Sequence, residues 1–116
     1  MLKTRFLPPL AVVLLLGACA GMTGGDPELY RRLTDRDVAL AAGLLQETLE
    51  GAPDGATRSW LNPDSGHRGT ITPTRTYLST AGIFCRDYRE ELVLGEQSGR
   101  FDHAACRDDS AGWRWL

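Results

Sequence analysis

The sequence predicts an α+β domain in which one N-terminal amphipathic helix packs on a small antiparallel meander of about six short strands, closed by one disulfide bond. Three observations lead to this prediction. Apolar residues recur at helical spacing over residues 35–50, short strand-like segments separated by turn residues follow from Arg58 onwards, and two of these segments contain a cysteine. A helix followed by a run of antiparallel strands is typical of an α+β domain.

The predicted helix has a start signal, an apolar face and a stop signal. Thr34 and Asp37 have the spacing of a capping box, and the acidic residues of the first turn suit the positive end of a helix. Gly51 and Pro53 supply the stop. The apolar positions between them fall on one helical face, and they are Val38, Ala41, Ala42, Leu45 and Leu49. This face is wide enough to pack against a sheet.

The rest of the chain alternates between strands and turns. Residues 58–61 lead into Asn62-Pro63-Asp64-Ser65-Gly66, where the proline, the aspartate and the late glycine predict a five-residue hairpin loop. Pro73 cannot donate a ladder hydrogen bond, so we expect a bend or an edge between strands at 67–72 and 74–79. Further strands are expected at 83–94, 100–108 and 113–115, with turns at 80–82, 95–99 and 109–112.

The first 18 residues have the organisation of a signal peptide. Lys3 and Arg5 precede an apolar stretch at 10–16 that is shorter than the roughly 20 residues of a bilayer span. The residues that follow, Leu16-Gly17-Ala18-Cys19, resemble the lipobox of bacterial lipoproteins, which implies cleavage before Cys19 and its lipidation. We therefore expect a signal peptide over 1–18, a lipidated cysteine and flexible tether over 19–33, and one domain over 34–116.

The expected lipid would hold the protein at a membrane. Each buried methylene contributes about 0.8 kcal/mol, and a bacterial lipoprotein anchor carries two or three acyl chains. Ala20 stands where lipoproteins retained in an inner membrane commonly have aspartate, and this analogy favours the outer membrane. Either leaflet would be compatible with the sequence.

Charge and cysteine content exclude several classes of function. Without the leader, 11 basic residues remain against 15 acidic ones (13 minus Lys3 and Arg5), which disfavours nucleic-acid binding. If Cys19 carries lipid, Cys85 and Cys106 remain as a pair, for which a disulfide is the expected state in an oxidising compartment. A metal site or a reactive thiol are the alternatives, but the sequence has no C-x-x-C or H-x-x-x-H spacing. We expect no metal and no cofactor.

A set of motifs extends over most of the predicted domain. In chain order they are Trp60-Leu61-Asn62-Pro63 with Gly66 and Gly69, Pro73 with Tyr77, Cys85-Arg86-Asp87-Tyr88, Ala105-Cys106-Arg107, and Gly112 with Trp113 or Trp115. Their order and spacing resemble the C-terminal domain of the rickettsial 17 kDa surface antigen family over about residues 38–116. The resemblance implies an outer-membrane lipoprotein with a small surface-antigen domain, in a family without an established enzymatic activity.

The chain departs from this family in two places. Members commonly carry a glycine-zipper segment between the lipidated cysteine and the domain, where this sequence has Gly21, Gly24 and Gly25. The Asp-Gly that precedes the last tryptophan in the family appears here as the longer turn at 109–112.

Two arginines form a candidate anion-binding site. Because side chains alternate along a strand, Arg86 and Arg107 should share the sheet face opposite the disulfide. There they would pair with acidic residues, namely Glu90, Asp102 or Asp108, or bind an external anion such as a lipopolysaccharide phosphate or a peptidoglycan carboxylate.

Three tryptophans form a candidate aromatic surface. Trp113 and Trp115 should lie on one face of the last strand, with Trp60 nearby. They would serve either as core residues or as a stacking surface for sugar rings.

No group of residues predicts a catalytic site. Asp64, Ser65 and His67 are turn neighbours that point in different directions, and no nucleophile-elbow motif is present. His103 has no thiol partner if Cys106 is bridged, and we expect both histidines to be exposed. The sequence thus favours a protein that is not an enzyme.

The expected function is that of a lipid-anchored lipoprotein of the outer membrane with a structural or interaction role. Its partners would be the membrane, through the lipid, and other envelope proteins, peptidoglycan or lipopolysaccharide. The alternative is a periplasmic ligand-binding or inhibitor module that acts on a cell-wall enzyme or glycan through Arg86 and Arg107.

Overall fold

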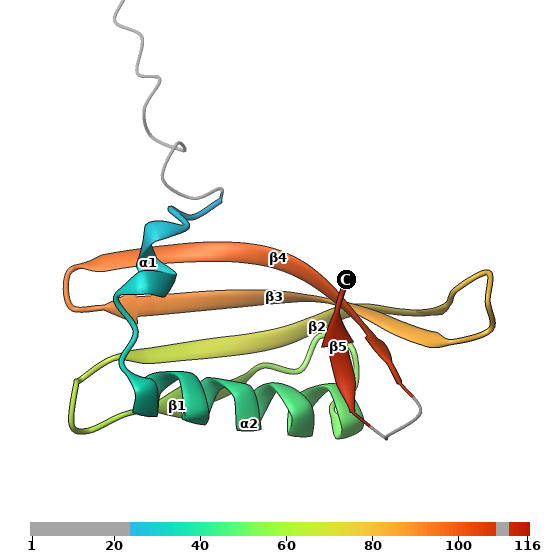
Figure 1. Ribbon diagram of the computed structural model, residues 1–116, viewed down its shortest axis with the longest axis horizontal. Helices are drawn as coiled ribbons and strands as arrows, with labels where there is room; N and C mark the ends of the chain where they lie inside the picture. The colour runs from blue at the N-terminus through green and yellow to red at the C-terminus, as the bar shows by residue number, and fades with distance from the viewer. Residues whose placement is uncertain (1–23, 109–111) are drawn as a thin grey trace, which may run out of the picture.

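The fold is α+β, as the sequence predicts (Figure 1). The computed structural model describes residues 24–108 and 112–116. The described elements are, in chain order, α1 (Glu28–Arg31), α2 (Asp35–Gly51), β1 (Arg58–Leu61), β2 (Arg68–Leu78), β3 (Phe84–Leu94), β4 (Gln97–Arg107) and β5 (Trp113–Trp115). The strands form one antiparallel sheet in the order β1-β2-β3-β4-β5, and α2 lies along one of its faces. Within these residues, no helix is long and apolar enough to cross a bilayer.

The capping box fixes the start of α2 at the predicted position. The Thr34 hydroxyl accepts a hydrogen bond from the Asp37 amide (3.0 Å), and the Asp37 carboxylate accepts one from the Thr34 amide (2.8 Å). The helix ends at Gly51, one residue after the predicted end. Leu45 and Leu49 on its inner face are buried, whereas Val38 is half exposed.

The meander has five strands in the described residues, not about six, because β2 is continuous through Pro73. The register with β3 shifts between Pro73 and Arg75, so the expected irregularity is a bulge inside one strand. Pro73 is tolerated because β1 pairs with β2 only as far as Ile71. Beyond Ile71, β2 needs no backbone donor on the side that faces β1. Its carbonyl accepts a hydrogen bond from the Gly55 amide (2.7 Å).

The turn between β3 and β4 is shorter than predicted. Leu94 pairs directly with Gln97, so Gly95 and Glu96 alone connect the strands, and Gly95 has the positive φ (68°) that such a tight turn requires. As a result, β4 begins at Gln97 where the sequence predicts a turn over 95–99. Of the turn predicted at 109–112, residues 109–111 lie outside the described residues.

The predicted tether over 19–33 is wrong in its second half. Residues 19–23 lie outside the described residues, but α1 occupies 28–31 and its Leu29 side chain is only 4% exposed. Leu29 packs with Trp60, Leu92 and Leu94 in one core cluster. The folded domain therefore begins before Thr34.

A second core cluster lies under the C-terminal half of α2. It contains Leu45, Leu49, Ile71, Tyr88, Ala105 and Trp113. The opposite face of the sheet carries cross-strand ion pairs, such as Arg75 with Asp87 (3.0 Å) and Arg89 with Asp102 (3.4 Å). Such polar ladders are expected where one face of an antiparallel sheet meets solvent.

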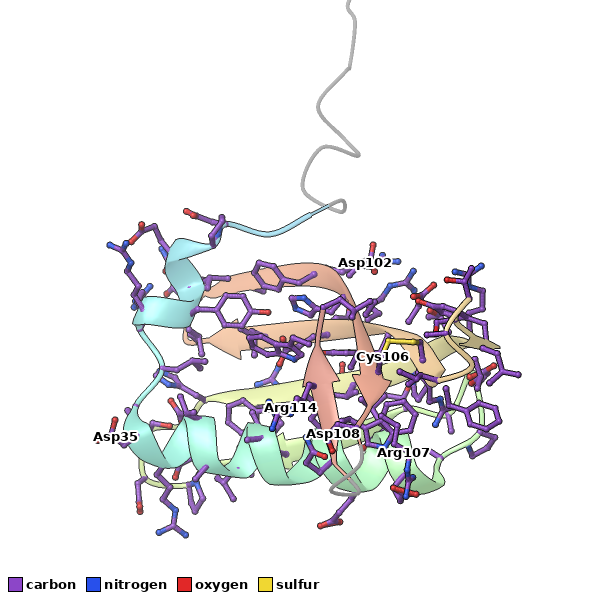
Figure 2. The ribbon with its side chains drawn as sticks, turned by 45° about the vertical axis from the view of Figure 1, so that its right-hand side comes forward. Asp35, Asp102, Cys106, Arg107, Asp108 and Arg114 are labelled. Atoms are coloured by element: carbon purple, nitrogen blue, oxygen red, sulfur yellow. A yellow bond between two sulfur atoms is a disulfide. The ribbon has the colours of Figure 1, made fainter. Side chains whose placement is uncertain are left out.

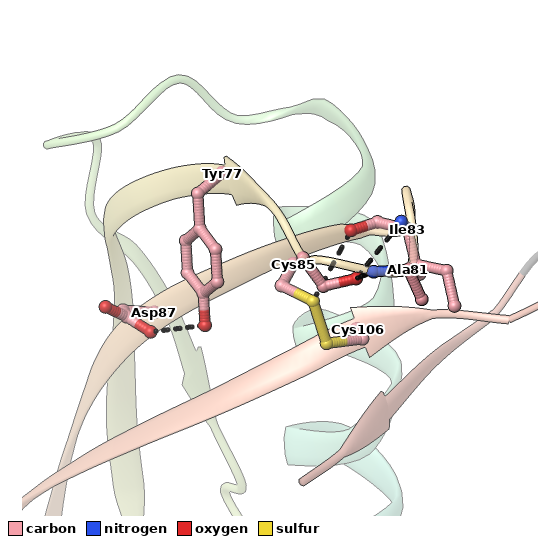
Figure 3. The surroundings of a disulfide bond; sticks show 7 residues. Tyr77, Ala81, Ile83, Cys85, Asp87 and Cys106 are labelled. Atoms are coloured by element: carbon pink, nitrogen blue, oxygen red, sulfur yellow. Dashed lines mark hydrogen bonds between the residues drawn. A yellow bond between two sulfur atoms is a disulfide. The ribbon is translucent and has the colours of Figure 1, made fainter.

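The disulfide predicted between Cys85 and Cys106 is present. The two residues are directly opposite each other in the β3–β4 ladder, 21 residues apart in sequence. Tyr77 pairs with Cys85 from β2, and its hydroxyl donates to Asp87 (3.2 Å) beside the bridge (Figure 3). The bond therefore ties two central strands together at the end where the β3–β4 hairpin is open.

Candidate functional site

Arg86 closes the C-terminal end of α2. Its guanidinium donates to the carbonyl of Leu49 (2.7 Å), to the Asp54 carboxylate (2.8 Å) and, through Nε, to the Thr76 hydroxyl (2.9 Å). A cation is favoured there by the negative end of the helix, whose last turn has no basic residue of its own. The hydrogen bond from Arg86 is the main reason that the pKa of Asp54 is lowered.

Arg107 lies on the same face of the sheet and points toward the end of α2 (Figure 2). Its Nη1 donates to both carboxylate oxygens of Glu50 (2.6 and 2.5 Å), and this hydrogen bonding lowers the pKa of Glu50. Both arginines are thus paired with acidic residues of the chain, but not with those the sequence suggested. No described contact favours an external anion at this face.

The three acidic residues that the sequence offered to these arginines have other partners. Glu90 accepts from Tyr30, Asp102 pairs with Arg89, and Asp108 pairs with Arg114. The pattern of alternation gives the face of each side chain, but it does not give the partner, because Glu50 and Asp54 come from α2 and the following loop.

The tryptophans do not form one aromatic surface. Trp60 and Trp113 are 6% and 8% exposed and belong to different core clusters, whereas Trp115 is 62% exposed. The Trp115 ring stacks on His103, with centroids 5.7 Å apart and planes nearly parallel. Of the three, Trp115 is therefore the one whose ring is largely exposed.

Asp37 is the centre of a polar cluster that sequence reasoning missed. The carboxylate is fully buried and, besides the Thr34 amide, it binds the side chains of Asn62 (2.8 Å), Ser65 (2.8 Å) and His67 (2.6 Å). Burial by itself would raise its pKa, but the hydrogen bonds from Thr34, His67, Asn62 and Ser65 outweigh it and hold the pKa far below its ordinary value.

This cluster fastens the start of α2 to the β1–β2 loop. Ser65 and His67 both contact the acid, and the Ser65 hydroxyl accepts from the His67 backbone amide (3.1 Å). No hydrogen bond joins the serine hydroxyl to the histidine ring among the described contacts, which a Ser-His-Asp nucleophile would need. The expectation that His67 is exposed is wrong, since its side chain is 18% exposed.

A second polar group lies on β3 and β4 beneath α1. The Tyr30 hydroxyl donates to Glu90 (2.5 Å) and is 2.9 Å from His103 Nε2, which is itself 3.4 Å from the same Glu90 oxygen. The expectation that His103 is exposed is also wrong, since its side chain is 25% exposed and packs between Tyr88 and Trp115.

Tyr30, Tyr88, Glu90 and His103 form the floor of a slot of about 400 Å³. Its lining residues come from α1, α2, β3, β4 and β5, and from Leu33 between the two helices. Apolar side chains form its walls, and they are Leu33, Val38, Ala41, Ala42 and Leu45, with Trp115 at the rim. No group of three or more potential metal ligands occurs within residues 24–108 and 112–116.

Comparisons with known proteins identify relatives of the domain. The family model described as "17 kDa outer membrane surface antigen" matches residues 47–114. The chain is similar to the 17 kDa surface antigens of Rickettsia bellii (strain RML369-C), with 35% identity over 82 residues, and Rickettsia prowazekii (strain Madrid E), with 35% identity over 80 residues. These alignments cover 71% and 69% of this chain and 52% and 50% of the relatives, so the chain spans about half of their length. No solved structure matches.

Proposed function

The chain belongs to the family of the 17 kDa outer membrane surface antigen, and we propose that it is a lipid-anchored lipoprotein of the bacterial outer membrane with a structural or interaction role. Membership itself carries the surface-antigen role that gives the family its name. The lipid anchor and the structural role are the steps beyond it. The alignments cover only about half of each relative, so these two properties are proposed for this chain from its own residues.

The observation that carries the proposal is the position of Cys19 relative to the folded domain. Cys19 ends a lipobox-like motif directly after an apolar leader, and α1 begins at Glu28. The residues between them, 20–27, span at most about 30 Å even when fully extended. A lipid on Cys19 would therefore keep α1 and the adjacent end of the sheet within reach of the bilayer surface.

We also propose that the domain acts by presenting surfaces and not by catalysis. The serine and histidine nearest to a catalytic arrangement, Ser65 and His67, are both bound to the buried Asp37. Cys106 is held in the disulfide. Their polar atoms support the architecture, which favours an interaction role.

Metabolic labelling tests the lipid anchor. Cells expressing the full chain are fed an alkyne analogue of palmitate and fractionated, with Cys19→Ala as the test variant and Met22→Ala as a matched substitution outside the motif. We expect label and outer-membrane recovery for the wild type and Met22→Ala, and no label for Cys19→Ala. Label that persists in Cys19→Ala, or is missing from the wild type, would contradict the anchor.

Cross-linking in intact envelopes tests the structural role. Recovery of integral outer-membrane proteins with the wild-type chain is the expected result. Recovery of a single soluble cell-wall hydrolase in their place would contradict it and would favour an inhibitor.

A further inference from the structure

The slot between α1, α2 and β5 combines an apolar wall with a buried acid. All the α2 side chains that line it are apolar, whereas Glu90, which is 7% exposed, lies at its floor. A volume of about 400 Å³ falls in the range of small-molecule sites. A mostly apolar cavity with a few convergent polar groups is the usual form of such a site.

Glu90 has an unused hydrogen-bonding oxygen. Tyr30 and His103 both contact Oε1, and Oε2 makes no hydrogen bond to any described residue. The Tyr30 and Tyr88 phenols both remain protonated, because burial and the charge of Glu90 raise the pKa of each one. Since Oε2 does not belong to the described buried atoms that lack a partner, it is accessible, and a donor or a cation in the slot can reach it.

Tyr88 adds a second unused group to the floor. Its side chain is 2% exposed and its hydroxyl has no hydrogen-bond partner of ordinary geometry, although the Trp115 indole is near enough to favour its ionised form. Buried polar groups are normally paired in folded proteins, so this hydroxyl adds polar character next to the slot, although its oxygen is closed to solvent in this structure.

The rim of the slot adds an aromatic surface to its apolar walls. Trp115 is exposed and its ring stacks on His103, which also lines the slot. The ionisable side chains that line the slot are Glu90, His103, Tyr30 and Tyr88, and α2 contributes none. Glu90 is the acidic group among them, so it favours a cationic ligand.

From these contacts we propose that the slot binds a small amphipathic cation, whose apolar body lies against α2 and whose protonated amine pairs with Glu90. The amine would donate to the free Glu90 oxygen. An anionic head group would meet the carboxylate and be rejected. The proposal rests on the geometry of the slot and is independent of the lipid anchor.

Calorimetric titration with three matched probes tests the ligand class. Phenylbutylamine, phenylbutanol and phenylbutyrate share one apolar body and differ in the charge of the head. The full chain is titrated as purified, in phospholipid nanodiscs if it is acylated and in buffer if it is not, with empty nanodiscs or buffer alone as the blank. We expect the amine to bind at least tenfold more tightly than the alcohol, and the carboxylate to bind most weakly. Absence of saturable amine binding, or equal affinity for all three probes, would overturn the proposal.

Three variants locate the binding. Glu90→Gln retains an acceptor for Tyr30 but removes the charge, so it should abolish the preference for amine over alcohol. Ala42→Trp fills the slot from the exposed side of α2 and should abolish binding of every probe, whereas Ala39→Trp on the same helix does not line the slot and should leave binding unchanged. Amine binding that survives Ala42→Trp, or a preference that survives Glu90→Gln, would contradict the proposed site.

Discussion

At the scale of single residues, Asp37 takes part both in a local helix cap and in hydrogen bonds with residues far away in the sequence. The capping box joins it to Thr34, three positions away, while Asn62, Ser65 and His67 reach it from across the β1–β2 loop. The sequence reveals the first contact because its spacing is local. The others depend on how the loop packs against α2, for which the sequence offers no fixed spacing.

We predict that Asp37→Asn lowers the free energy of unfolding by about 3 kcal/mol, since one partner is removed from a buried, charged hydrogen-bond cluster. The pKa of Asp37 is lowered on folding, so the unfolded chain takes up the proton first. The contribution of Asp37 to the free energy of unfolding is therefore complete above the ordinary pKa of about 3.9, and it is lost as the pH falls below that value.

Urea unfolding between about pH 7 and about pH 3 measures this contribution, and the variant should lose less stability than the wild type on acidification. Asp64→Asn in the same loop is the control, because its carboxylate is exposed and makes only a surface ion pair with Arg36 (3.7 Å). Parallel loss of stability in the wild type and Asp37→Asn below about pH 4 would contradict the account.

Two glycines should respond oppositely to alanine. A Cβ on Gly69 would lie 2.6 Å from the Trp60 indole nitrogen and 2.9 Å from the Glu91 carbonyl oxygen, whereas one on Gly43 would meet nothing within 4 Å. We predict that Gly69→Ala destabilises the domain by about 2 kcal/mol and that Gly43→Ala in α2 stabilises it by about 0.5–1 kcal/mol. Thermal unfolding of both variants is the measurement, and a neutral Gly69→Ala would show that the strand pairing is looser than described.

At the scale of elements, the sequence predicts α2 and the β1–β2 hairpin well because their signals are local. Caps, helical periodicity and the loop at 62–66 lie within the segments that they define. The continuous β2 is less predictable, since whether Pro73 interrupts a strand depends on where the neighbouring β1 ends.

The short helix α1 has no such local signal. Four residues cannot display helical periodicity, and Leu29 is recognisable as core only through its contacts with Trp60, Leu92 and Leu94. Residues 20–27 have little to bury and contain three glycines, and this composition predicts a tether. Its place in the domain comes from tertiary packing alone.

We predict that Leu29→Ala lowers the free energy of unfolding by about 3 kcal/mol, because the truncation leaves a cavity in the cluster with Trp60. Leu78→Ala is the matched control, since Leu78 is 58% exposed at the end of β2 and should change stability little. Chemical denaturation followed by tryptophan fluorescence reports both. Equal effects of the two variants would indicate that α1 is not part of the folded unit.

At the scale of the whole molecule, one helix layer covers one face of the sheet and the disulfide lies at the other face. The fold class, the antiparallel meander and the bridge follow from pattern, turn residues and cysteine count. The slot does not, because its walls and floor come from α1, α2, β3, β4 and β5, and no short sequence motif contains them.

We predict that replacing both bridge cysteines, as Cys85→Ser with Cys106→Ser, lowers the free energy of unfolding by about 3 kcal/mol, the value expected for a loop of this length. We expect the variant to retain the native fold at low temperature, which circular dichroism measures. Urea titration measures its stability. A midpoint unchanged from the wild type would mean that the bridge has no role in holding β3 to β4.

The measurement that tests the central claim most directly is the intact mass of the native chain purified from envelopes, before and after reduction. We predict the mass of a chain that starts at Cys19 and carries acyl groups, with a gain equal to two hydrogen atoms on reduction of the bridge. An unacylated mass would contradict the proposed membrane anchor, and a mass unchanged by reduction would contradict the disulfide-closed domain.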